Sequence, residues 1–347
     1  MNQSILGNLN PMPTKHINLD HGSGGTASHR LITGLFLPAF DNPILRKLDD
    51  SAQLTIGSTR IAFSTDTFIV HPFFFPGGNI GDLAINGTVN DIAMSGAKPL
   101  YLSVGLIIEE GFTLNSLELI LNSMKTAAKK ANVQIVTGDT KVMPSKALDG
   151  IAINTSGLGI IDSNCHISAS FAQAGDKILI SGTIADHGIT VLTQRENLQI
   201  EGDIQSDTAP LNDLVLNLIS KCPDIHVLRD PTRGGITAAL NEIASQSRVE
   251  IEILEDAVPI RPQVAACCEL LGLDPFSIAN EGKLIAFVPE SSVERALSLM
   301  KQHPMAKDAA VIGSVISDSK PLVYVKTSIG GRRLLHMPVG DQMPRIC

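Results

Sequence analysis

Two periodicities of apolar residues alternate along this chain. Continuous apolar runs rich in β-branched residues indicate strands, and stretches with apolar residues every three or four positions indicate helices. In the first half, strands are predicted at 60–70, 101–111, 133–142 and 150–161, and helices at 79–96 and 113–131. In the second half, strands are predicted at 177–182, 283–288 and 309–316, and helices at 234–246 and 292–302. This alternation predicts an α/β or α+β fold.

A polar, turn-forming interval at 162–176 separates the two blocks, so we place a domain boundary near residue 165. The predicted domains are 1–165 and 166–333. The remaining segment, 334–347, contains prolines and a glycine close to its end, which disfavours a helix. It is predicted to be an extended, mobile tail.

The composition narrows the class of protein. With 347 residues, of which 44% are hydrophobic and 18% charged, the chain can bury two cores of ordinary domain size. A net charge of −8 argues against a nucleic-acid partner. The sequence contains no run of eighteen apolar residues and starts without a leader-like pattern, so we expect a soluble cytoplasmic protein and no membrane partner. Its five cysteines form no disulfide framework.

Two glycine-led helix starts are candidates for holding phosphate. Gly24 and Gly25 precede one predicted helix, and Arg233 and Gly234 precede another. Glycines there let backbone N–H groups approach a phosphate, whose charge is favoured at a helix N-terminus. Ordinary turns use the same residues, so neither start identifies a site by itself. The Walker A pattern is absent.

Aspartates next to predicted strands and helices strengthen the case for a nucleotide. The set consists of Asp49, Asp50, Asp66, Asp91, Asp139 and Asp230. Taken singly, each of them is more often a turn or cap residue than a ligand. Together they favour Mg²⁺ shared with substrate phosphates. Lys141 is interpreted as a phosphate-facing charge, a base or a solvated surface residue, and Glu281 as a general base or a turn residue.

The last residue, Cys347, is a free thiol at the end of the predicted tail. A tail of ten extended residues spans roughly 30 Å, which is long enough to enter and leave a cleft. A cysteine on such an arm is either incidental or a nucleophile that uses this mobility.

Several long motifs, in order, resemble the hydrogenase maturation proteins of the HypE family. They are "HGSGGTASHRLI", the stretch from "FSTDTFIV" to "LIIEEG", "VTGDTKV", "SGTIADHG", "LRDPTRGG", "ANEGKL" and the terminal "PRIC". The terminal cysteine distinguishes this family from aminoimidazole ribonucleotide synthetase and selenophosphate synthetase, which share its fold.

The resemblance implies a two-domain fold of the aminoimidazole ribonucleotide synthetase type. It comprises an N-terminal domain that binds ATP and forms a homodimeric β-barrel, a C-terminal α/β sandwich, and a flexible tail. The resemblance also implies that the carbamoyltransferase HypF loads Cys347, that ATP drives dehydration of the thiocarboxamide to a thiocyanate, and that cyanide passes to the HypC–HypD complex.

By resemblance, the residues that bind Mg²⁺ are Asp50, Asp66, Asp91 and Asp139. The resemblance also assigns these four to the phosphates of ATP, and Cys347, Lys141 and Glu281 to catalysis. The two glycine-led helix starts add Gly24, Gly25, Arg233 and Gly234 as predicted ATP contacts. Two alternatives stay open: a phosphotransferase of the same fold in which Cys347 is incidental, and a non-catalytic nucleotide-binding scaffold.

Overall fold

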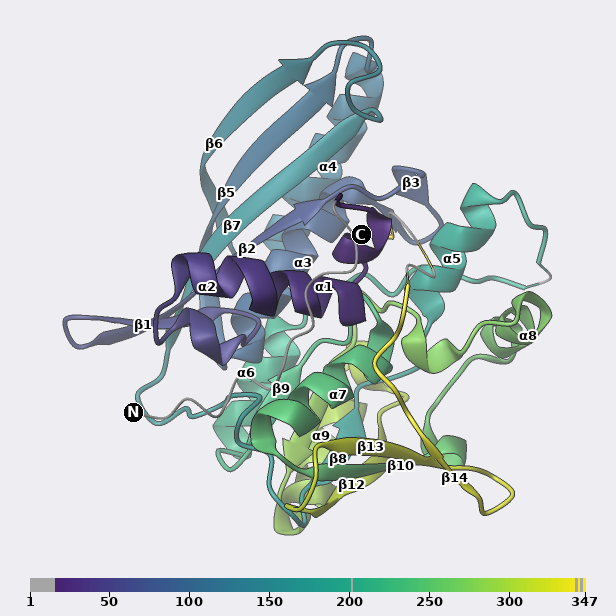
Figure 1. Cartoon of the computed structure of the whole chain (residues 1–347). Coiled ribbons are helices and arrows are strands. Elements are labelled where there is room, and N and C mark those ends of the chain that lie inside the picture. The colour runs from purple at the N-terminus through teal and green to yellow at the C-terminus, as the bar shows by residue number, and fades with distance from the viewer. Residues whose placement is uncertain (1–15, 201, 341–342, 344–345) are drawn as a thin grey trace.

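The computed structural model describes residues 16–200, 202–340, 343 and 346–347. Two mixed domains lie one above the other, each built on its own sheet (Figure 1). The chain passes from the first to the second between residues 161 and 177, the interval in which the boundary is predicted.

The first domain is an open five-stranded sheet, in the order β1-β2-β7-β5-β6, with helices on one face (Figure 1). Its strands are β1 (Ala52–Ile56), β2 (Thr59–Phe68), β5 (Ala97–Glu109), β6 (Gln134–Met143) and β7 (Ile151–Ile161), with a small hairpin of β3 (Phe74–Phe75) and β4 (Gly78–Asn79). Its helices are α1 (Thr26–Leu31), α2 (Leu37–Phe40), α3 (Ile80–Met94) and α4 (Leu114–Ala131). The sheet does not close into a barrel within one chain.

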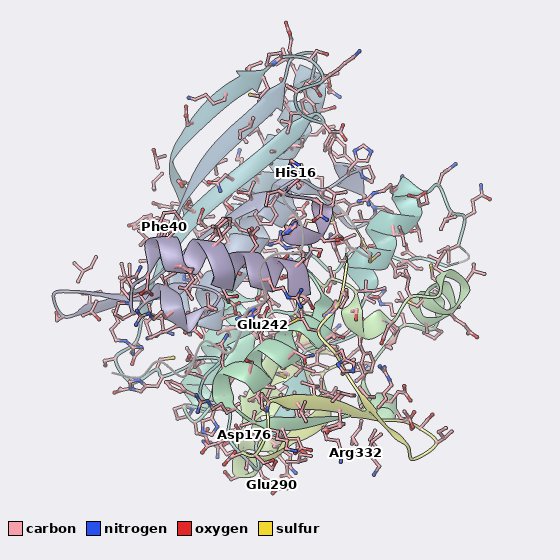
Figure 2. The ribbon with its side chains drawn as sticks, viewed as in Figure 1. His16, Phe40, Asp176, Glu242, Glu290 and Arg332 are labelled. Atoms are coloured by element: carbon pink, nitrogen blue, oxygen red, sulfur yellow. The ribbon has the colours of Figure 1, made fainter. Side chains whose placement is uncertain are left out.

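Side chains alternate between the two faces of this sheet, as strand geometry requires. The face toward α3 is buried. On the opposite face no element of the described residues covers the sheet, and Phe63, Tyr101 and Ile160 are 44%, 44% and 45% exposed. Strand β6 is exposed along its whole length at the edge of the sheet. Phe40, at the end of α2, is also exposed, as Figure 2 shows.

The second domain is a seven-stranded sheet in the order β14-β13-β10-β12-β8-β11-β9. Its strands are β8 (Lys177–Ile180), β9 (Val227–Arg229), β10 (Glu250–Leu254), β11 (Ile285–Val288), β12 (Ala310–Ser317), β13 (Leu322–Lys326) and β14 (Arg332–Leu334). Its helices are α5 (Asp186–Arg195), α6 (Asn212–Lys221), α7 (Gly235–Ser247), α8 (Pro262–Leu271) and α9 (Val293–Gln302). β14 ends at Leu334, so the sheet extends one residue into the segment predicted to be tail.

The buried apolar side chains form two clusters, and they do not coincide with the two domains. One cluster runs from α3 and the first sheet into α6, α9 and one face of the second sheet, and includes Ile80 and Leu214. The other fills the space between α7 and the opposite face of the second sheet, and includes Leu240 and Phe287. The chain buries two cores, as its size and composition predict, but the larger core is continuous across the domain boundary.

Candidate functional site

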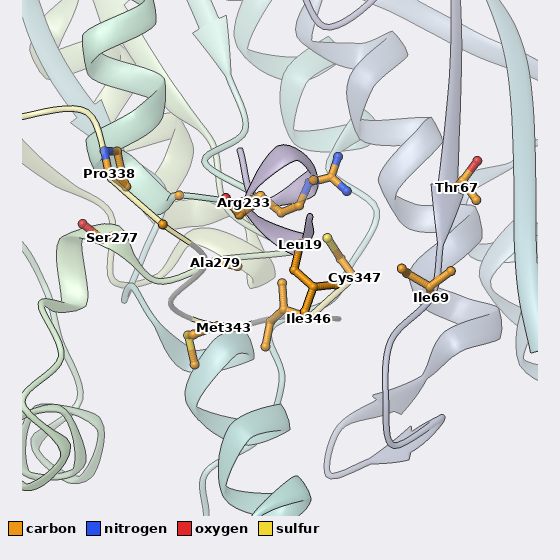
Figure 3. Close-up of a pocket in the computed structure, with 14 residues that line it drawn as sticks. Leu19, Thr67, Ile69, Arg233, Ser277, Ala279, Pro338, Met343, Ile346 and Cys347 are labelled. Atoms are coloured by element: carbon orange, nitrogen blue, oxygen red, sulfur yellow. The ribbon is translucent and has the colours of Figure 1, made fainter. Parts of the chain in front are cut away.

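A cavity of about 270 Å³ lies where the two domains meet the end of the chain (Figure 3). Its walls come from five segments: the loop before α1, the end of β2, the loop before α7, the turn after Phe276, and the last residues of the chain. The lining residues are Leu19, Gly22, Ser23, Thr67, Ile69, Arg233, Gly234, Ser277, Ala279, Pro338, Gly340, Met343, Ile346 and Cys347. Segments far apart in sequence therefore share one site.

The two predicted glycine-led helix starts meet at this cavity. Gly24 has a positive φ of 76°, and a Cβ there would lie 2.8 Å from the backbone oxygen of Arg233. A Cβ on Gly25 would lie 2.5 Å from the oxygen of Pro338. Gly234, at φ 78°, is the residue before α7. These glycines are required because backbones approach too closely for a side chain.

Three aspartates from different elements form a carboxylate cluster beside the cavity. Asp50 precedes β1, Asp91 lies in α3 and Asp230 follows β9, and one carboxylate oxygen from each lies within 4.8 Å of the others. Arg229 Nε contacts Asp50 Oδ1 at 2.9 Å, and Ser64 Oγ donates to Asp91 Oδ2 at 2.7 Å.

Burial and mutual repulsion disfavour the charged form of this cluster. Burial is the largest cause, and it holds the pKa of Asp50 and of Asp91 well above the usual range, with neighbouring carboxylates adding to it. Burial also raises the pKa of Asp230 to about 6, while Arg229 opposes the rise. Three hard oxygen donors that repel one another fit a divalent cation such as Mg²⁺, which would neutralise them.

Asp66 lies between this cluster and the cavity. It is in β2, next to the lining residue Thr67, and is close enough to interact electrostatically with both Asp91 and Cys347. Burial raises the pKa of Asp66, and Arg233 partly offsets the rise. Asp66 is not a member of the close group of three, so a cation held by that group has Asp66 as a neighbour.

The thiol of Cys347 is inside the cavity with only 7% of the residue exposed. Burial raises the pKa of the Cys347 thiol, Arg233 lowers it, and Glu281 raises it again. Figure 3 shows Cys347 and Arg233 on one side of the pocket and Ile69 on the facing strand. The segment predicted to be a tail has no helix or strand among its described residues after Leu334, which agrees with the predicted extended form. Its end is docked within the molecule, and its mobility stays a prediction.

Glu281 is a buried acid whose surroundings suit a general base. Only 3% of Glu281 is exposed, its Oε1 has no hydrogen-bond partner among the described residues, and it interacts with Cys347. Burial raises the pKa of Glu281 well above its usual range, with Asp207 the next cause. A carboxylate in such surroundings, once ionised, takes protons strongly.

Asp139 and Lys141 lie elsewhere in this chain. They pair with each other at 2.6 Å on the exposed strand β6, and this contact lowers the pKa of Asp139. Asp139 is in register with Gly105 of β5, and its row continues across β7 to Thr67 of β2. Three strand spacings amount to about 14 Å, so Asp139 and Lys141 do not reach the carboxylate cluster of their own chain.

Two residues of the site, Arg229 and His187, were not among the predicted site residues, and the resemblance assigned no role to a third, Asp230. Asp230, one of the predicted set of aspartates, completes the carboxylate cluster and directly follows β9. Arg229 is paired with Asp50 and with Glu242 of α7, which Figure 2 labels. His187 contacts the end of the chain, and only its position beside a glycine in the sequence signalled a role.

No helix in the parts of the chain that the structure describes is both long and apolar enough to cross a membrane.

Comparisons with known proteins follow the same division of the chain. Residues 48–161 match the family "AIR synthase related protein, N-terminal domain", and residues 173–326 match "AIR synthase related protein, C-terminal domain". The carbamoyl dehydratase HypE of Bradyrhizobium diazoefficiens is 49% identical over 332 residues, which cover 95% of this chain and 96% of that protein.

Two crystal structures are similar over most of their length. A chain in the HypE–HypF complex is 47% identical with a TM-score of 0.85, covering 89% of this chain and 99% of that one. HypE in complex with ATP is 51% identical with a TM-score of 0.81, covering 96% of this chain and 100% of that one.

Proposed function

Because this chain belongs to the HypE carbamoyl dehydratase family, we propose that it dehydrates a carbamoyl group carried on Cys347, using ATP, to a thiocyanate. The product supplies cyanide to the iron of nickel-iron hydrogenase. One observation carries the residue assignment: the only terminal thiol shares a cavity with Arg233 and interacts with the buried acid Glu281.

The chemistry requires the carbamoyl oxygen to become a leaving group. Transfer of the γ-phosphoryl group forms an O–P bond to this oxygen and breaks the bond to the β-phosphate, which leaves as ADP. The C–O bond then breaks with release of phosphate, the nitrogen loses two protons, and the C≡N bond forms. The elements of water thus leave within the phosphate and the released protons.

The residues of the site have roles in these reaction steps. Glu281 takes protons from the nitrogen, since its carboxylate is strongly basic where it is buried. Arg233 and the glycine loops face the phosphates. Asp50, Asp91 and Asp230, with Asp66 beside them, would hold Mg²⁺, which neutralises charge on the triphosphate. Burial raises the pKa of the Cys347 thiol and so disfavours the reactive thiolate inside the cavity, and we propose that the thiol is loaded outside it.

The carbamoyl donor is a partner protein. HypE has been crystallised in complex with HypF, and by that similarity we propose HypF as the partner that loads Cys347, with HypC–HypD as the acceptor of cyanide.

A second copy of the chain completes the site. The open face of the first sheet carries half-exposed Phe63, Tyr101 and Ile160, which a partner subunit would cover in a closed barrel. Asp139 lies on that open face, in the same row as Thr67, which also lines the cavity. We propose that each chain supplies Asp139 and Lys141 to the cavity of the other.

The tail chemistry is tested by the mass of the C-terminal peptide. Full-length protein is incubated with HypF, carbamoyl phosphate and ATP, and a carbamoyl adduct is expected on Cys347, followed by loss of one water only when ATP is present. An adduct on Cys222 or Cys165, or water loss without ATP, contradicts the proposal.

The shared site is tested by mixing variants. Lys141→Ala and Cys347→Ala chains are each expected to be inactive, and heterodimers of the two regain activity at one site if the partner supplies the lysine. If Lys141 instead acts within its own chain, an active site needs Lys141 and Cys347 on the same chain. Neither chain of this heterodimer has both residues, so no activity returns. Absence of recovery therefore rejects the exchange.

A further inference from the structure

The end of the chain is held in the cavity by contacts to its backbone. The N–H and hydroxyl of Thr26 donate to the oxygen of Pro338 at 2.9 and 3.1 Å. The N–H of Ile69 donates to the oxygen of Cys347 at 3.2 Å. Between these two points, His187 Nε2 lies 2.8 Å from the oxygen of Ile346. Of the residues in these contacts, His187 alone uses an ionisable side chain.

The partners of His187 determine which ring nitrogen carries the proton. The oxygen of Ile346 only accepts, so Nε2 is protonated and donates to it. Nδ1 then accepts from the hydroxyl of Ser206 at 2.7 Å. The carbonyl of Ile346 therefore sets the tautomer, and the hydroxyl of Ser206 is compatible with it because it donates to the unprotonated Nδ1.

The ring is packed in place, and its burial favours the neutral form. His187 is fully buried, and Phe75 packs edge-on against it with ring centroids 5.4 Å apart. Burial lowers the pKa of His187, although Asp207 opposes this. The donor thus occupies a fixed position one residue away from the reacting sulfur.

We propose that His187 is a positioning residue that holds Cys347 in the cavity and sets the ratio of docked to undocked tail. The inference rests on the proposed function only in that the docked thiol is the one that reacts. The sulfur is placed beside Glu281 and Arg233 when the Ile346 carbonyl is bonded, and it is free for partner proteins when that bond is broken.

The size of the effect follows from the burial of this carbonyl. Ile346 is 4% exposed, so removing its donor leaves a buried acceptor without this hydrogen bond. Losing one such bond shifts an equilibrium by roughly tenfold. The undocked fraction, and with it the rate at which a maleimide reaches the Cys347 thiol, is expected to rise by this factor.

The test measures maleimide labelling of Cys347 in the full-length chain, by mass spectrometry of the C-terminal peptide. His187→Phe keeps a ring but has no donor, and roughly tenfold faster labelling is expected. His187→Gln restores an N–H donor and is expected to label near the wild-type rate. His226→Phe is the matched control, since His226 pairs with Asp176 at 2.9 Å in the second domain.

Each outcome decides the proposal. Wild-type labelling in folded His187→Phe overturns it, as does equal acceleration in His226→Phe or in His187→Gln. Should His187→Phe not fold, His187→Leu carries the test, because it also lacks a side-chain donor for the carbonyl of Ile346; faster labelling supports the proposal and an unchanged rate rejects it. Labelling requires neither ATP nor a carbamoyl donor, so failure of the dehydratase chemistry would be seen separately.

Discussion

Removing a carboxylate from the cluster is expected to stabilise the metal-free protein while weakening its response to magnesium ATP. The change is Asp230→Asn. Asp230 is 6% exposed and its pKa is raised from 3.8 to about 6, chiefly by burial. Keeping it ionised at pH 7.5 therefore costs up to about 3 kcal/mol relative to the unfolded chain. The neutral amide avoids this cost.

The dependence on pH has a definite sign. A raised pKa means that folded protein binds the proton more tightly than unfolded protein, so wild type gains stability as the pH falls from above 6 toward 4. The variant has no such group to titrate. Its advantage is therefore largest above pH 7 and disappears near pH 4.

Calorimetry in the presence of a chelator measures the first effect, and a rise in Tm of about 5 °C is expected at pH 7.5. Adding magnesium ATP measures the second effect: a tenfold loss of affinity removes about 1.4 kcal/mol of ligand stabilisation. Asp213→Asn is the control, because the Asp213 side chain is 90% exposed on α6. A metal-free variant less stable than wild type, or one that gains as much from magnesium ATP, would refute the reasoning.

Three further outcomes are expected. Cys347→Ala abolishes thiocyanate formation, seen by mass spectrometry, but leaves ATP affinity unchanged, because truncating a docked terminal side chain disturbs docking and not the fold; retained cyanation would contradict this. Glu281→Gln lowers the single-turnover rate of dehydration by 10²-fold or more, since the amide cannot take a proton; a rate within a few-fold of wild type would remove Glu281 as the base. Gly24→Ala destabilises the chain, measured by thermal unfolding, because its Cβ would lie 2.8 Å from Arg233 at a positive φ; an unchanged Tm would exclude the close approach.

The elements with many buried positions could be predicted from the sequence. The strand expected at 150–161 is β7, and the helix expected at 113–131 is α4. β1 was not predicted, because Ala52–Ile56 has no fully buried position and depends on pairing with β2. The shared core was missed because the pattern of one helix does not say which sheet it packs against.

The candidate site could be predicted as a set of residue types but not as an arrangement. Asp66, Asp139 and Asp230 all follow or lie within apolar strands, and the sequence ranks them alike. Only the register of the first sheet shows that Asp66 and Asp139 point to opposite faces, since Asp139 shares its row with Thr67. The docking of Cys347 also depends on contacts to distant backbone, which no local pattern reveals.

The larger core has a consequence for how the protein works. Because buried side chains such as Ile80 and Leu214 belong to one packed cluster, the domains cannot hinge apart without exposing it. The walls of the cavity are thus expected to keep their arrangement, and the end of the chain, whose Ile346 and Cys347 belong to the same cluster, is the part that the proposed mechanism requires to leave. In the proposed mechanism, Cys347 carries the carbamoyl group between partner protein and cavity while the two domains keep their arrangement.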